Sequence, residues 1–182
     1  MRKLNKFLAA GMLLTFIAHA VMGSMKLLGS DADSLKMAAR VLFMLVAAHI
    51  IVTTALMVQT LYACKKTKAG YFWNNKIFWA RRISGFAVLI PLVMHAAIFS
   101  GTTETGAFRL VEFTAGRLIS QIMLVVFIAF HVLTNIEPMM ISFGVRSTKA
   151  FSHDAMFVIS VVLLLAAAAF AVYYLRWTAG VR

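Results

Sequence analysis

Four histidines lie deep within four separate hydrophobic segments of this chain, at His19, His49, His95 and His131. An ionisable imidazole inside a lipid bilayer is costly unless a partner satisfies it, so such a residue is a functional candidate. Neutral imidazole is a common ligand of haem iron. Four such residues on four consecutive segments predict two sites, each with two histidines on one haem iron, and hence electron transfer within a membrane.

Each histidine also has a simpler interpretation. A single intramembrane histidine can serve as a hydrogen-bonded packing residue, and this alternative loses weight here because four occur near mid-depth. A zinc or copper site is less favoured, since a tight metal cage needs ligands that converge within a few ångströms. His153 is different. It lies between Ser152, which can cap a helix, and Asp154, which suits a helix N-terminus, so it is expected at the membrane interface and not on iron.

The spacing between histidines and basic loop residues predicts which of them share an iron. His19 follows Lys6 by 13 residues. His95 follows Arg82 by 13 residues. Both therefore lie ~20 Å along helices that run in the same direction. Since two axial ligands of one iron need equal depth, His19 is expected to pair with His95.

The other two histidines lie on helices that run in the opposite direction. His49 precedes Lys65 by 16 residues. His131 precedes Arg146 by 15 residues. These similar spacings predict that His49 and His131 form the second pair.

Charged residues near these segments are candidates for supporting roles. Glu137 lies six residues after His131 and next to Pro138, which kinks a helix and frees a carbonyl group. It is either a quinone contact or proton-uptake group, or a carboxylate near the membrane surface that basic loops neutralise. Haem propionates would need cationic partners, although basic loop residues also set topology. The candidate partners are Arg40, Lys65, Arg81 and Arg82.

Membrane-spanning helices must position these residues. Of 182 residues, 62% are hydrophobic and 13% are charged, whereas soluble domains are about half apolar and a quarter charged. A bilayer needs roughly 20 apolar residues per helix. The sequence therefore predicts a single-domain, all-α integral membrane protein (residues 1–182) with five transmembrane helices, at about 4–28, 38–64, 83–100, 116–143 and 156–177. The first is expected to be a span and not a secretion signal, because its apolar stretch is long for one.

The loop charges predict how this bundle is oriented. Lys and Arg dominate the N-terminus and the loops after the second and fourth helices, whereas the other side mixes basic and acidic residues. The positive-inside rule then places the N-terminus in the cytoplasm and the C-terminus outside. This explains the net charge of +12 without a nucleic-acid partner. The single cysteine, Cys64, excludes an internal disulfide and an iron–sulfur cluster held by this chain alone.

A short motif adds a family resemblance. The stretch Ser84-Gly85-Phe86-Ala87 places a glycine ten residues before His95, and the chain has one histidine on each of its first four helices and none on the fifth. In these features it resembles the dihaem cytochrome b membrane subunit of succinate:quinone oxidoreductases, the family of succinate dehydrogenase and fumarate reductase. The resemblance covers most of the chain length.

This resemblance implies a cofactor set and partners. His19 and His95 would hold one haem b, and His49 and His131 the other. The chain would exchange electrons with menaquinone or ubiquinone and with peripheral iron–sulfur and flavoprotein subunits, in a bacterial cytoplasmic (inner) membrane. In the family, the haem of the second and fourth helices lies nearer the partner subunits, whereas His49 is counted here towards the outer end of its helix. Ala129 stands where some members carry a glutamate linked to proton transfer.

Two other functions remain open at this stage. The first is a cytochrome b anchor for another quinone-linked enzyme, such as a nitrate reductase or hydrogenase; these tend to carry several ligands on one helix. The second is a haem-free transporter or assembly protein, whose histidines would pack or relay protons. In each of these interpretations except the last, the chain is either a non-catalytic or a quinone-reactive subunit of a multisubunit oxidoreductase, and no catalytic side chain of its own is expected.

Overall fold

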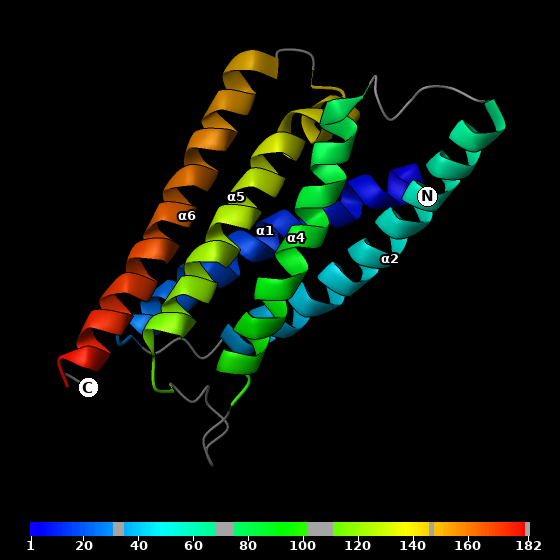
Figure 1. The fold of residues 1–182 in the computed structure, drawn as a ribbon. Coiled ribbons are helices and arrows are strands. Elements are labelled where there is room, and N and C mark those ends of the chain that lie inside the picture. The colour runs from blue at the N-terminus through cyan, green and yellow to red at the C-terminus, as the bar shows by residue number, and fades with distance from the viewer. Residues whose placement is uncertain (31–34, 68–74, 102–110, 146–147, 181–182) are drawn as a thin grey trace.

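The computed structural model describes residues 1–30, 35–67, 75–101, 111–145 and 148–180. Within these ranges the chain is helical and contains no strand, which confirms the predicted all-α fold. The helices are α1 (Arg2–Leu27), α2 (Leu35–Thr67), α4 (Lys76–Phe99), α5 (Ala115–Ser142) and α6 (Thr148–Thr178), shown in Figure 1.

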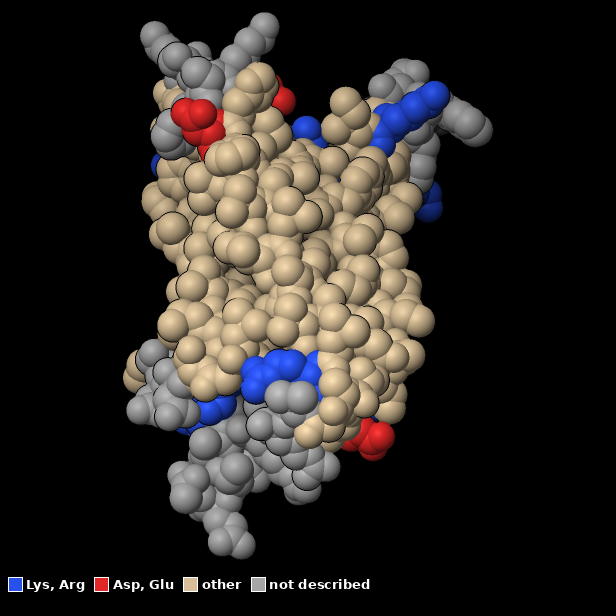
Figure 2. Space-filling view, turned by 90° about the vertical axis from the view of Figure 1, so that its left-hand side faces the viewer, with Lys and Arg blue, Asp and Glu red and all other residues tan. Residues whose placement is uncertain are grey.

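All five helices are long and apolar enough to cross a membrane. Their outward faces carry large apolar side chains, such as Leu14, Ile90 and Leu164, which are 70%, 74% and 69% exposed. Figure 2 shows the charged residues of one face gathered at the two ends, with a broad uncharged band between them. A surface of this kind would aggregate in water and is suited to lipid, so the chain is a membrane protein.

Successive helices run in opposite directions, and the two termini lie at opposite ends of the bundle (Figure 1). The N-terminal end of the bundle holds the starts of α1, α4 and α6 and the ends of α2 and α5. The helices pack side by side in the order α2, α1, α6, α5, α4. Among the described residues, α2 and α4 have at most sparse backbone contact, so the row is not closed by tight packing between its first and last members.

Two predicted helix starts differ from the observed ones by more than one helical turn. The third span begins at Lys76 instead of residue 83, because the side chain of Asn75 accepts a hydrogen bond from the backbone N–H of Phe78 at 2.9 Å and caps the helix there. The fifth begins at Thr148 instead of residue 156, so Ser152 lies inside the helix and the prediction that it caps the helix is wrong. Hydropathy marks only the part of a helix that lies in the bilayer, and polar turns that extend a helix beyond it escape that signal.

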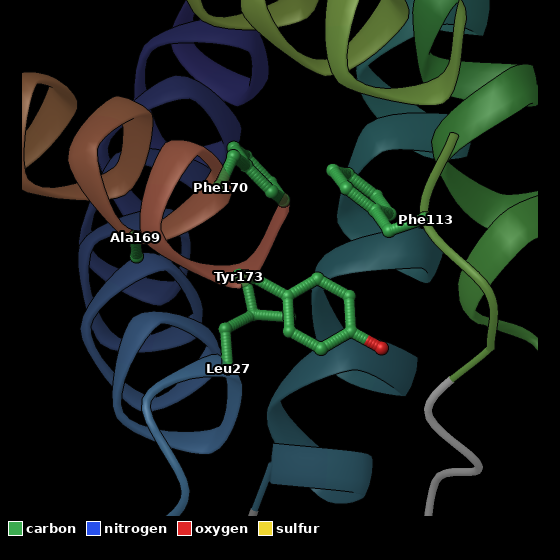
Figure 3. Packing of buried hydrophobic residues seen from close by; sticks show 5 residues of the cluster. All are labelled: Leu27, Phe113, Ala169, Phe170 and Tyr173. Atoms are coloured by element: carbon green, nitrogen blue, oxygen red, sulfur yellow. The ribbon is translucent and has the colours of Figure 1, made fainter. Parts of the chain in front are cut away.

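An aromatic cluster fixes the end of the bundle opposite the N-terminus (Figure 3). The rings of Phe113 and Phe170 stack at 6.2 Å between centroids with an interplanar angle of 10°. The hydroxyl of Tyr173 donates a hydrogen bond to the carbonyl of Val111 at 2.9 Å. These contacts tie the segment that leads into α5 against α6.

Replacing Phe113 with alanine should strongly destabilise the bundle. The side chain is only 1% exposed, so its removal leaves a cavity between α5 and α6. We expect a loss of about 3 kcal/mol in the free energy of unfolding, seen as a lower midpoint in thermal unfolding in detergent. The matched control is Phe157→Ala, at a position 70% exposed, which should change the midpoint little; equal losses in both variants would contradict the assigned core.

Candidate functional site

His19 and His95 meet across the bundle. Their ring centroids are 6.1 Å apart, and the ring planes are inclined at 80°. A metal–imidazole bond is about 2 Å long and the ring centre lies about 1 Å further, so two imidazoles on opposite sides of one metal have centres ~6 Å apart. The observed separation fits that arrangement. Since α1 and α4 are not close-packed neighbours among the described residues, the approach of the two rings is made by the side chains.

The surroundings of His95 are aromatic. Its ring centroid lies 5.1 Å from that of Phe99 and 6.3 Å from that of Phe170. Both phenylalanines belong to or pack against the aromatic cluster described above. The imidazole is therefore held in an apolar setting, which makes any polar interaction that it forms strong.

A chain of hydrogen bonds fixes the proton on His95. The hydroxyl of Ser120 donates to the carbonyl of Arg117 at 2.7 Å, so it accepts from the side-chain amide nitrogen Nε2 of Gln121 at 3.0 Å. The amide oxygen Oε1 of Gln121 then lies 2.7 Å from Nδ1 of His95. An amide oxygen only accepts, so His95 carries its proton on Nδ1 and keeps the lone pair of Nε2 for a metal.

His49 and His131 line a second site, a cavity of about 460 Å³ towards the N-terminal end of the bundle. The cavity is bounded by α1, α2, α4 and α5, and it lies where α2 and α4 leave the row of helices unclosed. Its size falls within the ~300–1,000 Å³ of ligand pockets. The two histidines, predicted to pair from loop spacing, thus face one space large enough for a sizeable ligand.

His131 is oriented by a shorter chain of the same kind. The hydroxyl of Ser84 donates to the carbonyl of Arg81 at 2.9 Å, and its oxygen lies 3.0 Å from Nδ1 of His131. The hydroxyl proton is already used, so Nδ1 of His131 donates and its Nε2 keeps a free lone pair. Gly85 makes room for this ring: a Cβ there would lie 3.1 Å from Cε1 of His131.

The other member of each pair is not anchored in this way. The Nδ1 atoms of His19 and His49 are buried and have no hydrogen-bond partner within the described part of the chain. A buried, unsatisfied ring nitrogen costs free energy, and coordination of that same nitrogen to a metal is one way to satisfy it. Each site therefore combines one ring of fixed tautomer with one ring that is uncommitted.

The rim of the cavity is basic. The lining formed by the described residues includes no Asp or Glu. It includes four cationic side chains, which are Arg2, Lys6, Arg81 and Arg82. Hydrogen bonds hold two of these groups in place, from Lys6 Nζ to the carbonyl of Ser142 at 3.1 Å and from Arg81 Nε to the carbonyl of Thr134 at 2.9 Å. The rest of the lining is mainly apolar, so the cavity suits a ligand with an apolar body and an anionic edge.

The remaining candidate residues lie elsewhere. Arg40 and Lys65, both exposed, are not part of the cavity lining. Glu137 is exposed and is also absent from it, although its neighbours Ile136 and Pro138 contribute. His153 lies within α6, so the expectation that the fifth helix carries no histidine is wrong, because the helix begins before the apolar run. Its side chain is exposed and belongs to neither pair.

Sequence reasoning did not identify the residues that orient the histidines. Gln121 is completely buried in an apolar helix, and Ser84 is 3% exposed; a buried amide in such a helix is the signal that could have drawn attention to Gln121. Among the described residues, no group of three His, Cys, Asp or Glu side chains gathers as a metal site, so the histidines meet only in twos. The chain matches no protein-family model, no curated protein and no solved structure.

Proposed function

We propose that this chain is a membrane cytochrome b that binds two haems through the pairs His19/His95 and His49/His131. The observation that carries the proposal is the arrangement of these pairs. In each of them, hydrogen bonds leave a lone pair free on Nε2 of one imidazole, and the partner imidazole is uncommitted. Bound haem would supply iron that alternates between its ferric and ferrous states.

The cavity lined by His49 and His131 supports haem over a bare metal ion. Its apolar walls suit the porphyrin ring, and Arg81 and Arg82 at its rim suit the propionates, which form charge-assisted hydrogen bonds with guanidinium groups. The guanidinium of Arg82 is held 5.0 Å from the ring centroid of Phe78. Arg2 and Lys6 add further positive charge at the same rim.

Two imidazole ligands on each iron favour electron transfer. Iron held by two imidazoles would have no open coordination position, so oxygen binding and activation would be disfavoured. The protein's own contribution is to hold the imidazoles, keep water out with an apolar surround and balance the charge of the propionates. We therefore propose a role as an electron carrier without catalytic side chains of its own.

The partners follow from the resemblance to succinate:quinone oxidoreductases. Because basic residues gather at the N-terminal end of the bundle, we place this end in the cytoplasm of a bacterial cell and the C-terminus outside. This end would dock an iron–sulfur subunit with its flavoprotein, and menaquinone or ubiquinone would exchange electrons within the membrane. The cavity of His49 and His131 is lined by residues of this end, such as Arg2 and Lys6. A haem bound in this cavity would then be the one nearer the partner subunits, as in that family.

A reduced-minus-oxidised absorption spectrum of the purified full-length chain tests the proposal. We expect a b-type haem band and two haems per chain. A His153→Ala chain, changed at a histidine outside both pairs, should give the same spectrum. Absence of haem from the wild-type chain purified from haem-replete cells would overturn the proposal and favour a haem-free transporter or assembly protein.

A further inference from the structure

Gln121 is a polar side chain with no exposed surface in a helix that is otherwise strongly apolar. It is one of two glutamines in the chain; the other, Gln59, is exposed on α2. Burying an amide costs free energy unless both its donor and its acceptor are satisfied. Here both are satisfied, by Ser120 and by His95.

The direction of this contact matters for the imidazole. Because the amide nitrogen donates to Ser120, the oxygen must face His95, and the contact is a short one at 2.7 Å. An acceptor that binds Nδ1–H pulls the proton away from the ring. The ring then keeps more electron density, and Nε2 becomes a stronger electron donor. In an apolar setting without competing water, this effect is larger than at a surface.

We propose that Gln121 is a positioning residue that fixes the tautomer of His95 and sets the redox equilibrium of the His19/His95 site. The inference rests on the proposed function, because it concerns an iron held by these two imidazoles. A more electron-rich imidazole stabilises the ferric form, so the hydrogen bond from His95 to Gln121 lowers the reduction potential of this site. Ser84 has the corresponding place beside His131, with a hydroxyl oxygen at 3.0 Å in place of an amide oxygen.

Potentiometric titration of four variants separates this role from simple packing. Gln121→Glu, which strengthens the acceptor, should shift one of the two potentials downwards, and Gln121→Leu, which removes it, should shift the same one upwards. We expect about a tenfold change in the ferric–ferrous equilibrium in each direction, which is ~59 mV for one electron. Ser84→Ala should move the other potential. Gln59→Leu should move neither.

A second measurement works without haem. In the apoprotein, ¹⁵N NMR of the histidine side chains should show His95 protonated on Nδ1, and Gln121→Leu should shift its population towards protonation on Nε2. Ser120→Ala removes only the acceptor that orients the amide, so it should weaken the preference while preserving the core volume better.

The outcomes are distinguishable. A wild-type chain without haem contradicts the proposed function, and the NMR tautomer still decides whether Gln121 orients His95. If haem is bound but both potentials stay the same in Gln121→Glu and Gln121→Leu, or move in the same direction, the tuning role of Gln121 is wrong. Opposite shifts confined to one haem support it, because a packing defect would not change sign with the strength of the acceptor.

Discussion

Replacing His95 with alanine should leave the chain with one haem instead of two. His95 shares its site with His19 alone of the other histidines, so His19→Ala should remove the same spectral component. The double variant His19→Ala/His95→Ala should lose no more haem than either single variant, because both side chains are proposed to bind one iron. Haem per chain and low-temperature spectra of the purified variants measure this.

The other pair provides the reciprocal experiment. His49→Ala and His131→Ala should each remove the second component and keep the first, since both residues line one cavity. His153→Ala is the control and should retain both haems. Retention of both haems in His95→Ala, or loss of different components in His19→Ala and His95→Ala, would contradict the assigned pairing.

Replacing Gly85 with alanine should selectively disrupt the His49/His131 site. The added Cβ would lie 3.1 Å from Cε1 and 3.5 Å from Nδ1 of His131, so the ring must move. Movement stretches the contact between His131 and Ser84, which lie on different helices. Such overpacking costs about 1–3 kcal/mol. We expect the haem of this site to be lost or bound at least tenfold more weakly, as measured by haem titration of the apoprotein.

Gly11→Ala is the matched control for Gly85. A Cβ at Gly11 would meet nothing within 4 Å, although this glycine also lies within a membrane-spanning helix. Alanine is the better helix former, so this variant should bind both haems and be at least as stable as the wild type. Equal loss of haem in the two variants would show that the close approach of α4 to His131 is not what the site depends on.

Local information was sufficient for the helices. Backbone groups in a bilayer must be satisfied within a helix, so runs of apolar residues in the sequence determine five spans and the all-α fold. The ends of the helices depend on other interactions. Asn75 starts α4 with a side-chain hydrogen bond, and Thr148 starts α6 well before the apolar run begins, so neither start could be read from hydropathy.

Residue type and spacing along the chain also determined the candidate ligands and which of them should meet. Depth along a helix is one-dimensional and can be counted, as for His19 and His95, which the structure brings to 6.1 Å between ring centroids. Depth is a poorer guide to surroundings. His49 was counted towards the outer end of α2, yet it shares a cavity with Arg2 and Lys6 of the opposite end, because the cavity extends along four helices.

Only the tertiary structure decided which groups control the histidines. The direction in which a side chain leaves a helix, and the neighbour it meets, depend on how each helix is rotated against the next, and spacing along the sequence does not contain that rotation. Both contacts, Gln121 with His95 and Ser84 with His131, join α4 to α5, so they depend on how these two helices pack together. The sequence determined the candidate ligands and their depth along each helix; helix packing determined which nitrogen of each anchored ring is free.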